Sequence, residues 1–176
     1  MFNKRVLALA LWVGLISPLA HAEKADKDKP ITITADRGSF DQIKGVTVWD
    51  GAVVVVQGTL QVHADHAVVT RDSKGNQTII ATGNIVTFRQ KADDTPDQKN
   101  VWIEGQASRI DYTSILHTVV LTTNARVKKG ADLVIGDVIT YDTETQVYQT
   151  RGGSANSANK GRVTAIIQPQ TQKATP

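Results

Sequence analysis

Residues 50–65 of this chain read DGAVVVVQGTLQVHAD, and this stretch decides the fold class. Four consecutive valines lead into the turn signal Gln57-Gly58, and apolar and polar residues then alternate from Leu60 to Asp65. Side chains branched at Cβ fit a pleated strand and crowd a helix. Two such segments separated by a short glycine-containing turn are typical of a β-hairpin. The stretch therefore predicts two antiparallel strands that meet near Gly58.

The same preference for strands extends along the chain. Residues 23–176 contain 18 Val, 13 Ile and 20 Thr, about a third of that segment, and only 4 Leu. Apolar residues alternate with polar ones, without a convincing helical period. Turn signals recur at short intervals: Arg37-Gly38, Lys44-Gly45, Asp50-Gly51, Gln57-Gly58, Lys74-Gly75-Asn76, Gly83-Asn84, Lys129-Gly130 and Arg151-Gly152-Gly153. This pattern predicts an all-β protein built from repeated short antiparallel strands, arranged as a sandwich, a jelly roll or an open barrel.

The N-terminus has the features of an export signal. Lys4 and Arg5 precede an apolar run of eleven residues, and Ala20-His21-Ala22 fits a signal-peptidase site. The run is shorter than the about 20 residues that span a bilayer. We therefore predict a cleaved signal peptide over residues 1–22, with a retained anchor as the alternative. The remainder is interpreted as a flexible N-terminus (23–29), one β domain (30–167) and a flexible tail (168–176).

Composition excludes several classes of function. The chain has no cysteine, so disulfides, thiolate catalysis and thiolate metal sites are excluded. Once the predicted signal peptide with Lys4 and Arg5 is removed, the chain carries 18 basic and 17 acidic residues, a net charge of +1. This charge does not indicate a nucleic-acid partner.

A local pattern recurs four times, as a small residue followed five positions later by a bulky one. The pairs are Ala35 and Phe40, Ala64 and Val69, Ala107 and Tyr112, and Gly136 and Tyr141. An aspartate directly follows the small residue in three of the copies: Asp36, Asp65 and Asp137. Repeats at such periods indicate stacked units that share a continuous interior. The recurring aspartates are interpreted as structural, for example as turn hydrogen-bond acceptors.

Motifs for chemistry are weak. His63, Asp65 and His66 are the one cluster of ligand-type residues, and strand alternation places His66 on the face opposite the other two, an incomplete metal site. The sequence has no nucleophile elbow, phosphate loop or zinc-helix motif. We therefore predict no enzymatic activity, no metal and no cofactor. Trp49 and Trp102 are interpreted as packing residues rather than as platforms for sugars or bases.

Several segments resemble the OstA-like domain family of lipopolysaccharide-transport proteins. The resemblance lies in Pro30 to Asp36, residues 50–65, Val119 to Val127, Gly136 to Tyr141 and Arg162 to Ile167, and so covers nearly all of the predicted domain. It implies an open-ended, twisted β-jelly roll that shields the acyl chains of lipopolysaccharide, its lipid A portion, inside. It also implies a periplasmic bridge that stacks head to tail between an inner-membrane anchor and an outer-membrane translocon with related domains.

A lipid groove requires apolar rows on many strands and ends that a neighbour can extend. Alternation places apolar pairs on common faces, although the same pattern also fits a dry, filled core. The predicted groove residues are Ile31, Ile33, Val54, Val56, Leu60, Val62, Phe88, Ile110, Tyr112, Val127 and Tyr141. The first and last strands, near residues 31–35 and 163–167, are the predicted edges for head-to-tail association. A self-assembling envelope protein without lipid cargo is the alternative.

Overall fold

The computed structural model describes residues 26, 29–95, 98–143, 145, 147–153 and 161–169. The predicted signal peptide lies outside these residues, as does most of the predicted tail. Ten strands make up most of the described chain: β1 (Ile31–Thr34), β2 (Arg37–Asp41), β3 (Val46–Gln57), β4 (Leu60–Arg71), β5 (Gln77–Lys91), β6 (Trp102–Thr113), β7 (Thr118–Lys129), β8 (Asp132–Asp142), β9 (Tyr148–Arg151) and β10 (Thr164–Ile166). Among the described residues, no helix has the length and apolar character needed to span a bilayer.

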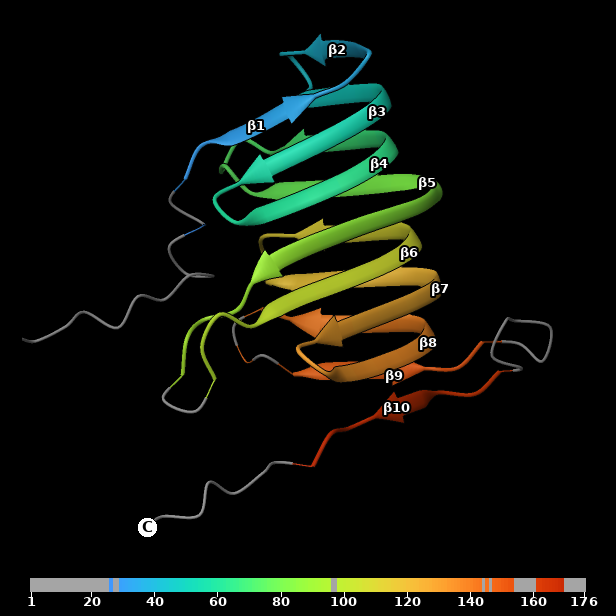
Figure 1. Cartoon of the computed structure of the whole chain (residues 1–176). Helices are drawn as coiled ribbons and strands as arrows, with labels where there is room; N and C mark the ends of the chain where they lie inside the picture. The colour runs from blue at the N-terminus through green and yellow to red at the C-terminus, as the bar shows by residue number, and fades with distance from the viewer. Residues whose placement is uncertain are drawn as a thin grey trace, which may run out of the picture.

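The strands form one antiparallel sheet in the order β1-β3-β4-β5-β6-β7-β8-β10, with β2 also paired to β3 and β9 also paired to β8. Strands β3 to β8 pair with one another in chain order and stack along one axis (Figure 1). The sheet does not close, because β1 and β10 lie at opposite ends of this order. The prediction of an all-β, open-ended antiparallel roll is therefore confirmed.

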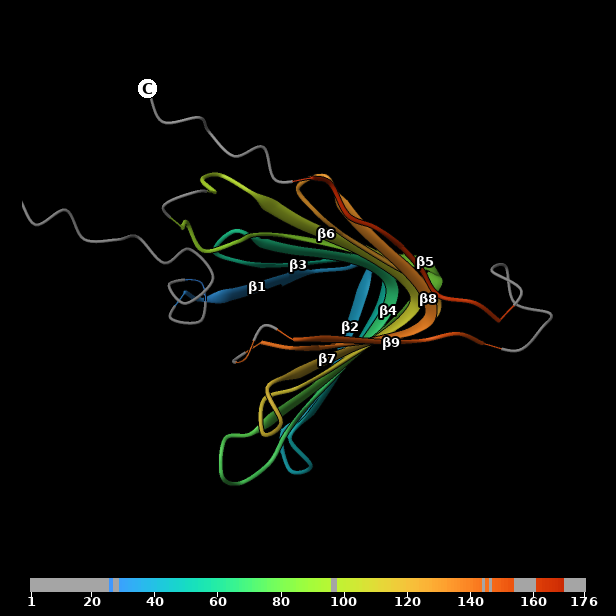
Figure 2. The ribbon, with the colours of Figure 1, turned by 90° about the horizontal axis from the view of Figure 1, so that it is seen from below.

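In cross-section the sheet is folded into a V (Figure 2). The first arm contains β1, β10, the C-terminal halves of β3, β5 and β7, and the N-terminal halves of β4, β6 and β8. The second arm contains β2, β9 and the other halves of the long strands. The arms meet at a vertex and diverge toward two rims formed by the hairpin turns (Figure 2).

The long strands bend at the vertex because the register shifts there. Five consecutive strand pairs, from β3–β4 to β7–β8, each have one irregularity in mid-strand. A β-bulge bends its strand and increases the local twist. At one of them Gly51 has a φ of 79°, and a Cβ there would lie 2.9 Å from the Cβ of Asp36, so only glycine fits without strain.

The prediction of short strands was wrong for β3 to β8. The six strands β3 to β8 are 11 to 15 residues long. Three of the turn signals, Arg37-Gly38, Asp50-Gly51 and Gly83-Asn84, lie within strands. Glycine followed or preceded by a polar residue marks a turn and a bulge equally well, so the sequence pattern could not separate the two.

Three of the four copies of the repeat lie at the vertex. Ala64, Ala107 and Gly136 are buried there, each paired with a residue next to a register shift. Asp65, which follows Ala64, accepts a hydrogen bond of 2.8 Å from the backbone N–H of Asn84 on the neighbouring strand β5. The structural interpretation of the recurring aspartates holds for this copy. The small residues allow the arms to meet, because larger side chains would separate the inner faces at the vertex.

Candidate functional site

A groove of about 370 Å³ lies between the inner faces of the two arms. Each wall is a row of apolar side chains that are cross-strand neighbours along the sheet. The row on one arm faces the row on the other. On the first arm, one row runs through Val55, Val62, Phe88, Gly105 and Val127. Consecutive residues of this row are direct cross-strand partners, so the row is continuous along the stacking axis.

The second arm supplies the facing wall. Its outer row runs through Ile79, Tyr112, Val119, Tyr141 and Tyr148, again as successive cross-strand partners. The rings of Tyr141 and Tyr148 stack, with centroids 4.4 Å apart. Burial raises the pKa of Tyr112 above its ordinary value, because the apolar surroundings disfavour phenolate. The phenol therefore brings no charge into the groove at neutral pH.

Toward the vertex the arms converge (Figure 2) and the side chains that line the groove become more deeply buried. Ala67 and Ala81 line it there and are almost fully buried. Leu121 and Ile139, paired across β7 and β8, are completely buried. These residues belong to the buried hydrophobic core, which forms the floor of the groove.

Polar side chains line the rims of the groove. Gln57, Gln90 and Asp26 lie at the rim of the first arm, and Gln77, Ser114, His117 and Thr143 lie at that of the second arm. Asp26 is 5% exposed and accepts hydrogen bonds from Thr59 N (2.9 Å), Thr59 Oγ1 (2.5 Å) and Gln90 Nε2 (3.2 Å). These bonds hold residue 26 against the turn between β3 and β4. An apolar interior with a polar margin suits a molecule that has hydrocarbon at one end and polar groups at the other.

The structure places most of the predicted groove residues in this lining. The eight that line it are Ile31, Leu60, Val62, Phe88, Ile110, Tyr112, Val127 and Tyr141. Ile33 shares the inner face and packs against the core, but is not part of the lining.

Val54 and Val56 were placed on the wrong face by the sequence prediction. They pair with His63 and Gln61, whose side chains lie on the outer face, whereas Val53 and Val55 line the groove. A run of four valines contains no alternation of apolar and polar residues, so the run by itself does not show which two valines face inward. The two-residue turn supplies the missing signal, because pairing Gln57 with Leu60 places Val55 opposite Val62.

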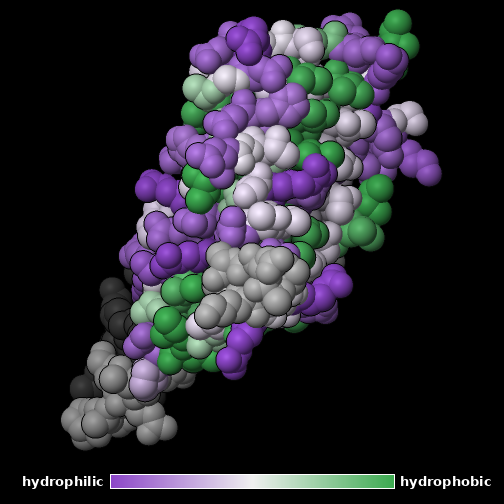
Figure 3. Space-filling view, turned by 90° about the vertical axis from the view of Figure 1, so that its right-hand side faces the viewer, coloured by the Kyte–Doolittle hydropathy of each residue, from purple (hydrophilic) through white to green (hydrophobic). Residues whose placement is uncertain are grey.

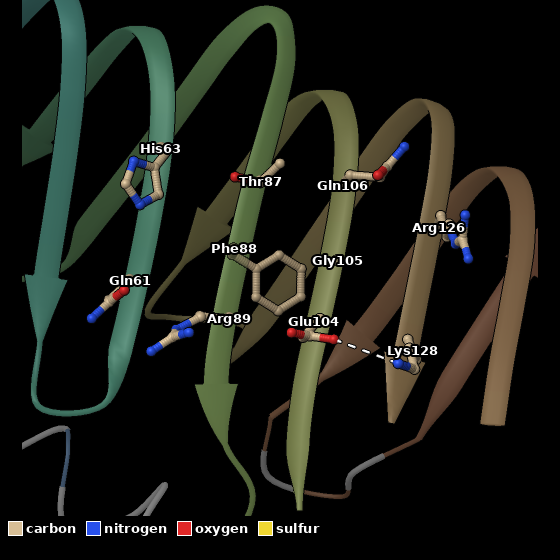
Figure 4. A pocket seen from close by; sticks show the side chains of 10 residues that line it. All are labelled: Gln61, His63, Thr87, Phe88, Arg89, Glu104, Gly105, Gln106, Arg126 and Lys128. Carbon is tan, nitrogen blue, oxygen red and sulfur yellow. Dashed lines mark ion pairs between the residues drawn. The ribbon is translucent and has the colours of Figure 1, made fainter. Parts of the chain in front are cut away.

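The outer face of the first arm differs in chemistry from the groove. A shallow cavity of about 550 Å³ there is lined by two polar rows, with Phe88 and Gly105 between them (Figure 4). One row contains Gln61, Arg89, Glu104 and Lys128, and the other contains His63, Thr87, Gln106 and Arg126. Lys128 Nζ lies 3.9 Å from Glu104 Oε2, and the Arg89 guanidinium lies 4.7 Å from the ring centroid of Trp102. Seen from the vertex, the outer surface is largely hydrophilic, with hydrophobic residues in narrower rows (Figure 3). The outer face of the first arm is therefore mainly polar, whereas the groove on its inner face is mainly apolar.

The histidine cluster does not form a site. The register shift in β4 places both His63 and His66 on the outer face, whereas strict alternation predicts opposite faces for them. His66 Nδ1 lies 2.6 Å from Asp50 Oδ1 instead of near His63. Within the described part of the chain, no group of three or more histidine and carboxylate side chains could hold a metal ion.

A family model and individual proteins of known sequence both relate this chain to lipopolysaccharide transport proteins. A sequence model described as "LptA/(LptD N-terminal domain) LPS transport protein" matches residues 32–147. The lipopolysaccharide export system protein LptA of Haemophilus influenzae is 33% identical, over 99% of this chain and 97% of that protein. Escherichia coli K12 LptA is 35% identical, over 95% of this chain and 87% of its own length.

A solved structure agrees with these matches. The crystal structure of Pseudomonas aeruginosa LptH, described as the LptA-homologous periplasmic component of the lipopolysaccharide transport device, superposes with a TM-score of 0.70 at 25% identity. The match covers 82% of this chain and 99% of LptH. The chain therefore belongs to the LptA/LptD N-terminal domain family of lipopolysaccharide transport proteins.

Proposed function

We propose that this protein carries lipopolysaccharide through the periplasm, with the acyl chains of its lipid A portion sheltered in the groove between the two arms. The observation that carries the proposal is the continuous apolar row from Val55 to Val127, enclosed by two arms and edged by polar rims. Relatives that match most of this chain in sequence or in structure are named as components of lipopolysaccharide export or transport. The groove thus has a role in carriage for outer-membrane assembly rather than in catalysis.

The energetics favour a continuous groove over a closed pocket. Transferring ten methylenes from water to an apolar site is worth about 8 kcal/mol, so acyl chains do not leave a shielded site quickly. Movement along a row of equivalent contacts exchanges one set of apolar neighbours for another at little net cost. Direction must then come from an energy-using membrane partner.

The direct test is capture of lipopolysaccharide by the purified mature protein, measured by co-elution in size-exclusion chromatography and mass spectrometry. We expect intact lipopolysaccharide to co-elute, whereas chemically deacylated lipopolysaccharide, which keeps its sugars and phosphates, is not retained. Equal retention of both ligands would place recognition outside the groove. Retention of neither would favour the alternative of a structural envelope protein without lipid cargo.

We further propose that copies associate head to tail and dock in the same way on an inner-membrane anchor and an outer-membrane translocon with related domains. In the described chain, β1 pairs only with β3, and β10 pairs only with β8, so each leaves one edge for another strand. Joining opposite edges is a heterologous contact that extends into open rods.

Light scattering at increasing protein concentration tests this assembly. We expect the mass of the intact chain to rise with concentration, and a chain ended after Arg162, which lacks β10, to stay monomeric. All three residues of β10 are exposed, so its loss removes little core. Ile115→Ser, in the exposed turn between β6 and β7, controls for non-specific hydrophobic association. An intact chain that remains monomeric at the highest concentration would contradict the proposal.

A further inference from the structure

The row of inner-face residues on the first arm contains one position without a side chain. Gly105 on β6 lies between Phe88 on β5 and Val127 on β7 as their cross-strand partner. It is buried, although it belongs to a wall otherwise made of large apolar residues. The ring of Phe88 extends from β5 toward Gly105 (Figure 4).

The ring occupies the space that a side chain at position 105 would need. A Cβ built on Gly105 would lie 2.7 Å from Cζ and 3.0 Å from Cδ1 of Phe88, and closer still to Cε1. Real Cβ atoms do not approach other heavy atoms this closely, so one of the two groups would have to move. The φ of Gly105 is not positive, so the backbone conformation does not require glycine here. The ring of Phe88 is therefore the reason that position 105 needs a bare Cα.

We propose that Gly105 sets the usable width of the groove, because its bare Cα forms a recess in which the Phe88 ring lies against the sheet. The inference rests on the proposed function and concerns which ligands the groove admits. The groove volume of about 370 Å³ is at the lower end of the range for small-molecule sites. Several acyl chains lying side by side need more width than a single chain, so a ring displaced from the recess into the groove would exclude a multi-chain ligand first.

A purely structural role must be separated from this one. Aromatic rings placed over glycine in a sheet also stabilise the strand pairing, and such packing alone would give Gly105 a role in folding but none in ligand choice. A structural role predicts that substitutions change the melting temperature and affect all ligands equally. A width-setting role predicts that bulky ligands are lost before slender ones.

The experiment measures the affinity of the Gly105→Ala protein for two probes. One is intact multi-chain lipopolysaccharide, and the other is a fluorescent fatty acid with a single 16-carbon chain. We expect affinity for lipopolysaccharide to fall by about tenfold or more, as overpacking of a close contact implies, and affinity for the fatty acid to change by less than about twofold. Gln106→Ala, the adjacent position on the outer face, is the matched control and is expected to leave both affinities unchanged.

The role of the ring is tested by repeating the substitution in a Phe88→Leu chain. There the recess is no longer filled by a ring, so Gly105→Ala is expected to change lipopolysaccharide affinity by less than about twofold relative to Phe88→Leu alone. Equal losses for both probes, an unchanged affinity for lipopolysaccharide, or a full effect in the Phe88→Leu background would each overturn the inference.

Alanine suits a strand better than glycine does, so Gly105→Ala is expected to fold. If thermal melting shows otherwise, Phe88→Trp provides the same test, because the larger ring cannot enter the recess and must protrude. If the unaltered protein captures no lipopolysaccharide, the proposed function fails, whereas the width of the groove can still be measured by comparing single-chain and branched-chain fatty acids.

Discussion

Replacing Val62 with aspartate is expected to abolish capture of lipopolysaccharide. Val62 lies in the inner row, between Val55 and Phe88, and lines the groove. An ionised carboxylate there would have to lose its hydration when acyl chains enter, and no cation lines the groove among the described residues to compensate. The loss is expected to be at least about a hundredfold in affinity, measured by co-elution of lipopolysaccharide with the purified protein.

His63→Asp is the matched control for this substitution. It introduces the same charge at the neighbouring position, but on the polar outer face. It is expected to leave capture unchanged, so that any effect of Val62→Asp is attributable to the groove rather than to net charge. Ile110→Asp on the opposite arm is expected to reproduce the loss. A folded Val62→Asp protein that captures lipopolysaccharide as the unaltered chain does would show that the acyl chains bind elsewhere.

Replacing Leu121 with alanine is expected to produce the largest loss of stability from a single truncation. Leu121 is completely buried at the vertex and is the cross-strand partner of both Ile110 and Ile139. Removing its branched end leaves a cavity where the two arms are joined, which costs about 2–5 kcal/mol in the free energy of unfolding. Small domains are stable by about 5–15 kcal/mol in total, so urea denaturation followed by circular dichroism would detect the change clearly.

Leu116→Ala provides the comparison. Leu116 is 65% exposed in the turn between β6 and β7, so its truncation removes little packing. Its effect is expected to stay within about 0.5 kcal/mol. Equal effects at positions 116 and 121 would mean that the vertex is not the closely packed core of the protein.

The strand content and the hairpin order could be predicted from local sequence. The turn at Gln57-Gly58 and the alternation from Leu60 onward specify a hairpin by themselves, and the structure has β3 and β4 there. The inward face of β4 also follows from its alternation, which is why Leu60 and Val62 were assigned correctly to the inner face. These features depend on preferences of the backbone and on side-chain period, and both are local.

The bends could not be predicted in the same way. Gly51 and Gly83 carry the same signal as turn glycines, yet each lies in a continuous strand. A chain reverses at a glycine when its two flanking segments pair with each other, and bends when both pair with the same neighbouring strand. Which of these occurs depends on strands distant in sequence, so the V-shaped section appears only in the assembled sheet.

The sequence by itself determined that this protein is an antiparallel β-structure with apolar residues on one face of most strands, because β-branched side chains and a period of two act over a few residues. Tertiary structure decided where the long strands bend and that Phe88 lies over Gly105. These features depend on register between strands, and register is set by pairing and packing across the whole sheet rather than by any single segment.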